Sequence, residues 1–194
     1  MQEERRSEIL GILTIALSVF VFVSLVGYNS NEEPSISSTV QVTNPMGILG
    51  VYTAHLLIKL GFGFLSIIIP LLGIGWGWFL FAKKELEYLV RLSSYSLGFL
   101  FLISVTIGVF SELLIEDSSS RYFLSGQIGG VVGSFFLSWL SAWGTLLLFI
   151  AIYLVLIRGY FNIDYYSPFK NLMVKMDLWK KEDRERKNLK EKEE

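Results

Sequence analysis

Few side chains in this sequence could do chemistry, and they are scattered. The chain has no Cys and a single His, His55, so disulfides, thiolate nucleophiles and Cys-ligated zinc are impossible and a His-based metal site is disfavoured. His55 with Ser66 or Ser134 is the one conceivable Ser–His pair, but neither serine lies in a nucleophile-elbow motif. We therefore expect no catalytic, cofactor-binding or metal-binding residues, and interpret His55 as a polar residue on an interfacial helix.

Phosphate-binding loops are also absent from the sequence. No Gly-x4-Gly-Lys-Ser/Thr occurs, and Gly73, Gly75 and Gly77 lie in an aromatic, apolar segment that no strand precedes. Pumps and channels usually need ionisable groups within their spans, whereas Glu112 and Lys59 fall at span ends here. The sequence therefore disfavours nucleotide binding, ion transport and any cofactor.

Glycine spacing is the most regular pattern in the chain. The candidate packing residues are Gly47, Gly50, Gly61, Pro70, Gly130, Gly133 and Gly144. A shift of 83 residues lays the first three glycines over the last three, so each half reads as span, outer loop, amphipathic helix, span. An even number of spans per half makes the two copies parallel. Small residues let helices approach closely in lipid, so we expect a packing role, with ligand cradling as the alternative. The proline is expected to kink the second span.

The composition is that of an integral membrane protein. Of 194 residues, 52% are hydrophobic and only 18% are charged, with a mean hydropathy of +0.50. Residues 124–157 contain no charge, whereas most of residues 180–194 are charged, so the net charge of −1 conceals a strong segregation. This excludes a soluble enzyme, a basic DNA-binding module and a disulfide scaffold.

Apolar block lengths and basic residues predict an all-α integral membrane fold with four spans. The spans cover about residues 9–27, 61–82, 92–111 and 143–158, and amphipathic helices over about 46–59 and 126–141 are interfacial or re-entrant. Four spans place fifteen of the seventeen Lys and Arg on one side, which makes both termini cytoplasmic. Six spans would move Lys83, Lys84 and Arg91 to the wrong side.

Two regions follow from this division. Residues 1–165 are predicted to form the membrane domain, and residues 166–194 a cytoplasmic amphipathic helix with a charged linker. Ser167 and Pro168 suit the N-cap and first position of that helix, and apolar residues follow at helical spacing. The linker, Lys180 to Glu194, mixes seven basic with six acidic residues, so we do not expect it to be a DNA-binding arm.

Two glycine-containing motifs resemble those of a known protein family. Asn44-Pro-Met-Gly-Ile-Leu-Gly50, followed by Gly61-Phe-Gly63 and Pro70, resembles the N-terminal membrane domain of FtsK/SpoIIIE-type bacterial DNA translocases. Gly129-Gly130-Val-Val-Gly133 and Trp143-Gly144-Thr145 agree with it in the second half. The resemblance covers roughly residues 6–165, including the four-span topology and the charged tail.

This resemblance implies an anchor in the bacterial cytoplasmic membrane, placed at the division septum. Its partners would be the lipid bilayer, further copies of itself and other cell-division membrane proteins. In the family a cytoplasmic hexameric motor pumps double-stranded DNA with ATP during chromosome segregation. That motor is not within these 194 residues, so ATP and DNA are implied only through it and no catalytic residue can be carried over. The alternative is a stand-alone small polytopic scaffold or transporter subunit, with an intramembrane hydrolase a distant third.

The Lys/Arg distribution makes the topology testable by labelling single cysteines in intact cells. Positions 84 and 194 should be protected from a membrane-impermeant thiol reagent, because they flank the basic side, and positions 33 and 119 should react. Labelling at Lys84→Cys from outside would overturn the four-span topology and favour six spans.

Overall fold

The computed structural model describes residues 2–32, 42–115, 124–162, 170, 173–176 and 178–179. The chain forms two compact units, Met1–Tyr153 and Leu154–Glu194. Several predicted features lie outside the described residues: the outer-loop residues Glu33 and Arg121, the expected helix start at Ser167, and the charged linker.

Helices account for the regular structure throughout the described part of the chain. Their order is α1 (Gln2–Val26), η1 (Ser30–Glu32), α2 (Gly47–Ala54), η2 (His55–Phe62), η3 (Gly63–Ile67), α3 (Ile68–Phe81), α4 (Glu87–Leu114) and α5 (Gly126–Phe161). The segment η2 is π-helical, and η1 and η3 are 3₁₀ helices. Four helical segments, residues 5–26, 47–81, 87–114 and 126–161, are long and apolar enough to cross a membrane, which confirms the predicted all-α membrane fold.

Small residues bring α1 and α3 into close contact. A Cβ atom added to Gly77 would lie 2.5 Å from Ile15 Cγ1 and 2.8 Å from the Gly11 carbonyl oxygen. One added to Gly73 would meet the Ser18 hydroxyl at 2.2 Å. Only residues without a side chain allow this separation, which is how helices gain van der Waals contact in lipid.

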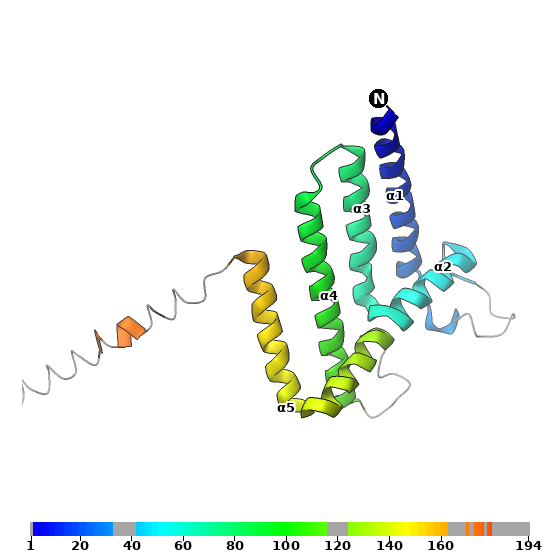
Figure 1. The fold of residues 1–194 in the computed structure, drawn as a ribbon. Helices are drawn as coiled ribbons and strands as arrows, with labels where there is room; N and C mark the ends of the chain where they lie inside the picture. Colours follow the sequence, from blue (N-terminus) through cyan, green and yellow to red (C-terminus); the bar gives the residue numbers. More distant parts are fainter. Residues whose placement is uncertain are drawn as a thin grey trace, which may run out of the picture. The chain divides into compact units, whose positions relative to one another are not determined.

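Two shorter helical segments lie across one end of the three helices α1, α3 and α4. Figure 1 shows α2 with η2, and the first half of α5, at the end opposite the N-terminus and the α3–α4 connection. Ala54 and Ile58 pack on Leu25 at the end of α1, and all three are almost fully buried. These segments correspond to the amphipathic helices of the two predicted repeats.

Each transverse segment ends at a break in the backbone. Gly61 (φ −84°, ψ −122°) ends the first and Ser141 (φ 57°, ψ 173°) ends the second. Ser66 Oγ donates to the Leu57 carbonyl, and Thr145 Oγ1 lies 3.1 Å from the Phe136 carbonyl oxygen. Both hydroxyl side chains are fully buried, and each reaches a carbonyl nine residues earlier in the chain.

These two equivalent hydrogen bonds, one in each repeat, correct the register of the internal repeat. The two bonds are related by a shift of 79 residues, and the same shift relates Gly47, which opens α2, to Gly126, which opens α5. The predicted shift of 83 is wrong by four residues, about one helical turn. Gly47 therefore corresponds in position to Gly126 and not to Gly130.

Pro70 does not kink the second span. It lies buried in the first turn of α3, where a missing N–H costs no helical hydrogen bond. The interruption occurs earlier instead, at Gly61–Gly63, where the chain passes from η2 into η3.

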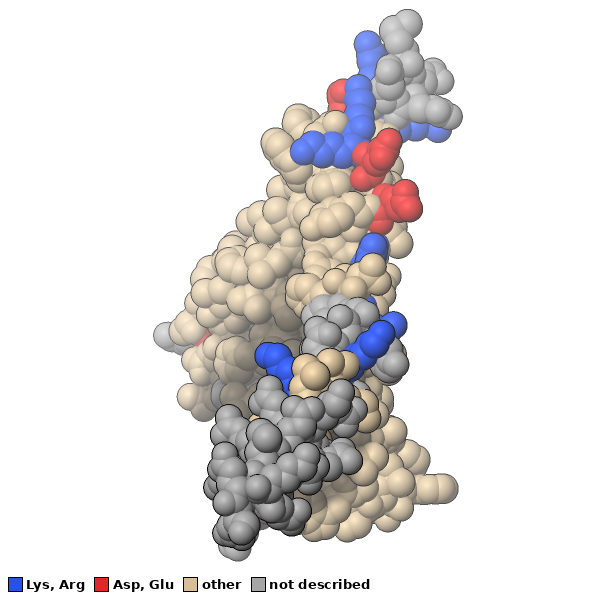
Figure 2. Space-filling model, turned by 90° about the vertical axis from the view of Figure 1, so that its left-hand side faces the viewer, with Lys and Arg blue, Asp and Glu red and all other residues tan. Residues whose placement is uncertain are grey.

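The helix α4 joins the first repeat through a polar contact. Trp76 Nε1 of α3 donates to Ser93 Oγ of α4 at 2.8 Å. At the same end of the bundle, Lys83 forms an ion pair with Glu8 at 2.9 Å, with both side chains nearly half exposed. Figure 2 shows acidic and basic side chains near the end where α1 begins and further basic side chains elsewhere on this face, whereas most of the visible surface is neither basic nor acidic.

The second unit contains the end of α5, at Phe161. Residues 173–176 and 178–179 are helical, within the region predicted as a cytoplasmic amphipathic helix. The exposed apolar side chains there are Met173, Val174, Met176, Leu178 and Trp179.

A buried carboxylate organises the connection from α1 to α2. The Thr43 hydroxyl and backbone N–H both donate to Glu32, as does the Asn44 backbone N–H, at 3.2 Å. Asn44 in turn donates through Nδ2 to the Ser24 and Gly27 carbonyls at the end of α1, at 3.0 and 3.1 Å. Asn44 thus satisfies carbonyls that the helix end would leave without partners.

The Glu32 network predicts an acid-sensitive contribution to stability. Hydrogen bonding by the Thr43 hydroxyl, aided by the Thr43 and Asn44 N–H groups, holds the pKa of Glu32 below its ordinary value of 4.5, although burial opposes this. Because the folded state prefers the ionised form, the contribution is present above pH 4.5 and is lost as the pH falls through the folded-state pKa.

Glu32→Gln should therefore lower the melting temperature at neutral pH, with the difference from the unsubstituted chain shrinking below pH 4.5. Thermal unfolding in detergent across pH measures this. Glu85→Gln, at an exposed position between α3 and α4, is the control. A difference for Glu32→Gln that stays constant with pH would contradict the assignment.

Candidate functional site

The two repeats meet at a junction of bare backbone. A Cβ atom added to Gly63 would lie 1.9 Å from the Leu124 carbonyl oxygen, and one added to Gly126 would lie 2.1 Å from the Gly61 carbonyl oxygen. The break that ends η2 is therefore in direct contact with the start of α5. We call these four residues, Gly61, Gly63, Leu124 and Gly126, the repeat junction.

A second close contact continues from the junction along α4. The Ser104 hydroxyl donates to the Ser125 carbonyl at 2.6 Å, and both side chains are fully buried. A Cβ atom added to Gly129 would meet Ser104 Oγ at 2.2 Å, and one added to Gly108 would meet the Gly129 carbonyl oxygen at 2.3 Å. A Cβ atom on Gly133 would lie 2.9 Å from the Val109 nitrogen. The first half of α5 thus lies against the α4 backbone.

Apart from Gly61, which lies at the repeat junction, the glycines singled out by spacing occupy three kinds of position. Gly133 packs against α4, and buried Gly130 has its nitrogen 2.9 Å from where a Cβ on Gly108 would be. A Cβ atom added to Gly50 would lie 2.3 Å from Asn44 Oδ1, which explains part of the Asn44–Gly50 motif. No atom lies within 4 Å of a Cβ atom added to Gly47. A Cβ atom added to Gly144 would meet only the Leu140 side chain of its own helix, at 3.2 Å.

Sequence reasoning missed the residues that make the closest contacts. Gly63 and Gly108 were not proposed as packing residues, nor were Ser66, Ser104 and Thr145. Small residues and hydroxyls inside an apolar run were the available signal, because each needs a close neighbour or a backbone acceptor when buried.

The conceivable Ser–His pair does not form. His55 Nδ1 is buried without a hydrogen-bond partner among the described residues. Ser66 donates to Leu57, and Ser134 Oγ lies 3.0 Å from the Gly130 carbonyl oxygen and 3.2 Å from Glu112 Oε2. Within the described part of the chain, no group of three or more His, Cys, Asp or Glu could hold a metal ion.

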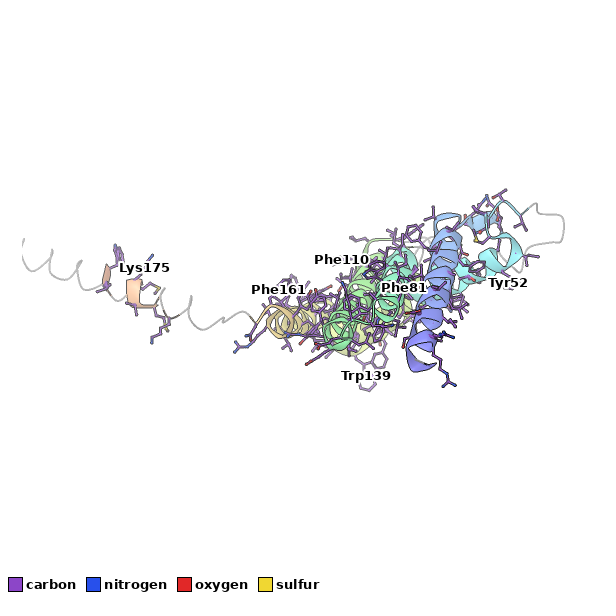
Figure 3. All side chains as sticks on the ribbon, turned by 90° about the horizontal axis from the view of Figure 1, so that it is seen from above. Tyr52, Phe81, Phe110, Trp139, Phe161 and Lys175 are labelled. Atoms are coloured by element: carbon purple, nitrogen blue, oxygen red, sulfur yellow. The ribbon has the colours of Figure 1, made fainter. Side chains whose placement is uncertain are left out.

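Large aromatic side chains lie around the backbone break at Ser141 in α5. Trp139 and Trp143 are 76% and 83% exposed, and Figure 3 shows Trp139 projecting away from the helices. The rings of Phe135 and Trp139 lie 5.4 Å apart. Exposed indoles next to a helix that lies across the bundle are typical of the membrane–water interface.

These features define a class of protein: an α-helical membrane domain with four helices able to span a membrane among the described residues, in which two transverse segments interlock through glycine. Residues 3–173 match the family described as the 4TM region of DNA translocase FtsK/SpoIIIE, and the chain belongs to that family. No curated protein and no solved structure matches the chain.

The repeat junction can be tested with a matched pair of glycines. Gly47 and Gly126 both begin a helix with a positive φ, +66° and +67°, but only Gly126 has neighbours within 4 Å. Gly47→Ala should lower the free energy of unfolding by about 1 kcal/mol, because alanine disfavours the positive φ at this position. Gly126→Ala should cost about 1–3 kcal/mol more, because the new methyl group overlaps the Gly61 and Gly63 backbones.

Thermal unfolding in detergent, with size-exclusion chromatography of the folded fraction, measures both substitutions. Gly133→Leu should behave like Gly126→Ala, because it would force α5 away from Val109. Equal losses of stability for Gly47→Ala and Gly126→Ala would show that the close contact at the repeat junction contributes nothing to stability.

Proposed function

We propose that this chain is the membrane-anchoring and assembly domain of a DNA translocase that acts at the division septum in chromosome segregation. The observation that carries the proposal is the family match over residues 3–173, which embraces all four helices able to span a membrane. The chain would lie in the bacterial cytoplasmic membrane with both termini in the cytoplasm.

The chemistry of the described residues supports an anchoring role in place of a catalytic one. The sequence contains no P-loop, and His55 makes no hydrogen bond with Ser66 or Ser134. ATP hydrolysis and DNA movement are assigned to a motor domain that these 194 residues do not include.

Assembly would use the surfaces that the bundle leaves exposed. In the transverse segment of α5, Val131, Phe135 and Trp139 are exposed and apolar. In α2 and η2 the exposed apolar side chains are Ile48, Leu49, Tyr52, Leu56 and Leu60. These two faces are our candidates for contact with further copies of the chain and with other division proteins in the membrane.

Localisation of a fluorescent fusion in a dividing bacterium tests the proposal. The fusion should concentrate in a band at the septum, because the domain would be held there by other membrane-bound division proteins. Gly47→Ala should keep the band, whereas Gly126→Ala should weaken it several-fold by disturbing the repeat junction. Even fluorescence around the whole membrane from the unsubstituted chain would refute a septal role.

A further inference from the structure

A short apolar segment follows α5 in the second unit. Residues 173–176 and 178–179 are helical, and Met173, Met176 and Trp179 recur there at every third residue. At about 100° per residue, these three side chains lie on one face of the helix, within an arc of about 120°. They are 53%, 50% and 69% exposed. This face, which we call the Met–Trp face, is therefore left uncovered by the described residues.

A lysine lies on either side of the Met–Trp face. Lys170 falls about 60° beyond Met173, and Lys175 falls about 40° beyond Trp179 at the opposite edge. Both lysines are exposed. A lysine in such a position can lay its methylene groups along the apolar surface and extend its ammonium group to the level of phosphates. The two edges of the face are thus arranged for an anionic partner.

The opposite face of the segment carries a smaller apolar pair, Val174 and Leu178, which are 50% and 56% exposed. In the sequence, Phe169 and Leu172 stand at the spacing that continues the Met–Trp face. The Met–Trp face is therefore the larger of the two, and it carries the indole, a side chain that favours the boundary between hydrocarbon and headgroups. Val174 and Leu178 provide an internal comparison.

The chain keeps this segment close to the membrane. The end of α5 carries Arg158 and the ring pair Tyr160–Phe161, whose centroids are 4.7 Å apart, and these residue types are typical of a membrane boundary. Seven residues separate Asn162 from Lys170, so these two lie at most about 29 Å apart. Binding of the segment to the membrane would therefore be intramolecular, at a high effective concentration.

The charge of this region complements an anionic surface. Between residues 158 and 181 the sequence has five basic residues and two acidic ones, which gives a net charge of +3. Each lysine close to an anionic leaflet strengthens binding about fivefold. Lysine is depleted in protein–protein interfaces, whereas lysines beside an apolar face with an indole are typical of helices that lie in the membrane interface. This chemistry favours a lipid surface over a protein partner.

We propose that residues 170–179 bind the surface of the membrane leaflet at which α5 ends, through its anionic phospholipids. The Met–Trp face enters the boundary between headgroups and hydrocarbon, and Lys170 and Lys175 contact the lipid phosphates. The charged linker then begins at the membrane surface. The assignment needs only the membrane location of the chain and does not depend on the septal role.

Spin labels on the full chain in lipid vesicles test the proposal, because the chain has no Cys of its own. Met176→Cys and Val174→Cys, at positions equally exposed but on opposite faces, are labelled and compared. In vesicles of phosphatidylglycerol and phosphatidylcholine in equal amounts, the label at 176 should collide more with oxygen than with a water-soluble nickel chelate. The label at 174 should show the reverse. In phosphatidylcholine alone, the embedded fraction at 176 should fall several-fold.

Lysine substitutions separate charge from apolar contact. Lys170→Gln with Lys175→Gln should lower the ratio of embedded to free label at position 176 about 25-fold, which is two fivefold losses combined. Lys190→Gln with Lys192→Gln, the same loss of charge further along the chain, is the matched control and should leave the ratio nearly unchanged. Size-exclusion chromatography of each variant checks that the bundle stays folded.

Equal accessibility at positions 174 and 176, or the same embedding in vesicles without phosphatidylglycerol, would overturn the proposal. Loss of collisions with both oxygen and the chelate at position 176 would show that protein covers the face, and would overturn it as well. Septal localisation is measured separately with the fluorescent fusion, so failure of either proposal is distinguishable from failure of the other.

Discussion

Backbone hydrogen bonding at the two bends governs this fold. Each repeat turns from a helix lying across the bundle into a spanning helix, which takes carbonyls out of the helical ladder. An unsatisfied carbonyl in hydrocarbon costs several kcal/mol. Ser66 and Thr145 provide the missing donors from the span itself, and both are completely buried. A hydroxyl in the first turns of the span thus holds the transverse segment at a fixed place.

The glycine contacts follow from that placement. Once both transverse segments lie across the same end of the bundle, the end of η2 meets the start of α5, and no side chain fits between Gly63 and the Leu124 carbonyl. The same reasoning applies where Gly129 meets Ser104 on α4. The Gly63–Leu124 contact joins segments some sixty residues apart and so links the two repeats. The Ser104–Gly129 contact, between residues twenty-five apart, lies within the second repeat and fixes its transverse segment on α4.

The fold class was predictable because the lengths of apolar blocks and the positions of Lys and Arg are local signals. The register of the repeat was not. The shift of 83 matched glycine to glycine, whereas the equivalent residues are Ser66 and Thr145, which share a hydroxyl but not an identity. An error of four residues is close to one helical turn and leaves residues on nearly the same face, so the wrong shift still produced a sensible pattern. Backbone contacts such as Gly63 with Leu124 depend on tertiary placement, which spacing alone does not give.

The two repeats have the same order of segments but differ in how closely their spanning helices pack on each other. The first is self-contained, because Gly11, Gly73 and Gly77 let α1 and α3 pack along their length. The second packs its transverse segment tightly on α4 but leaves the following part of α5 apart from it. Hydrocarbon contact is nearly as favourable as protein contact for apolar side chains in a membrane, so this opening costs little stability.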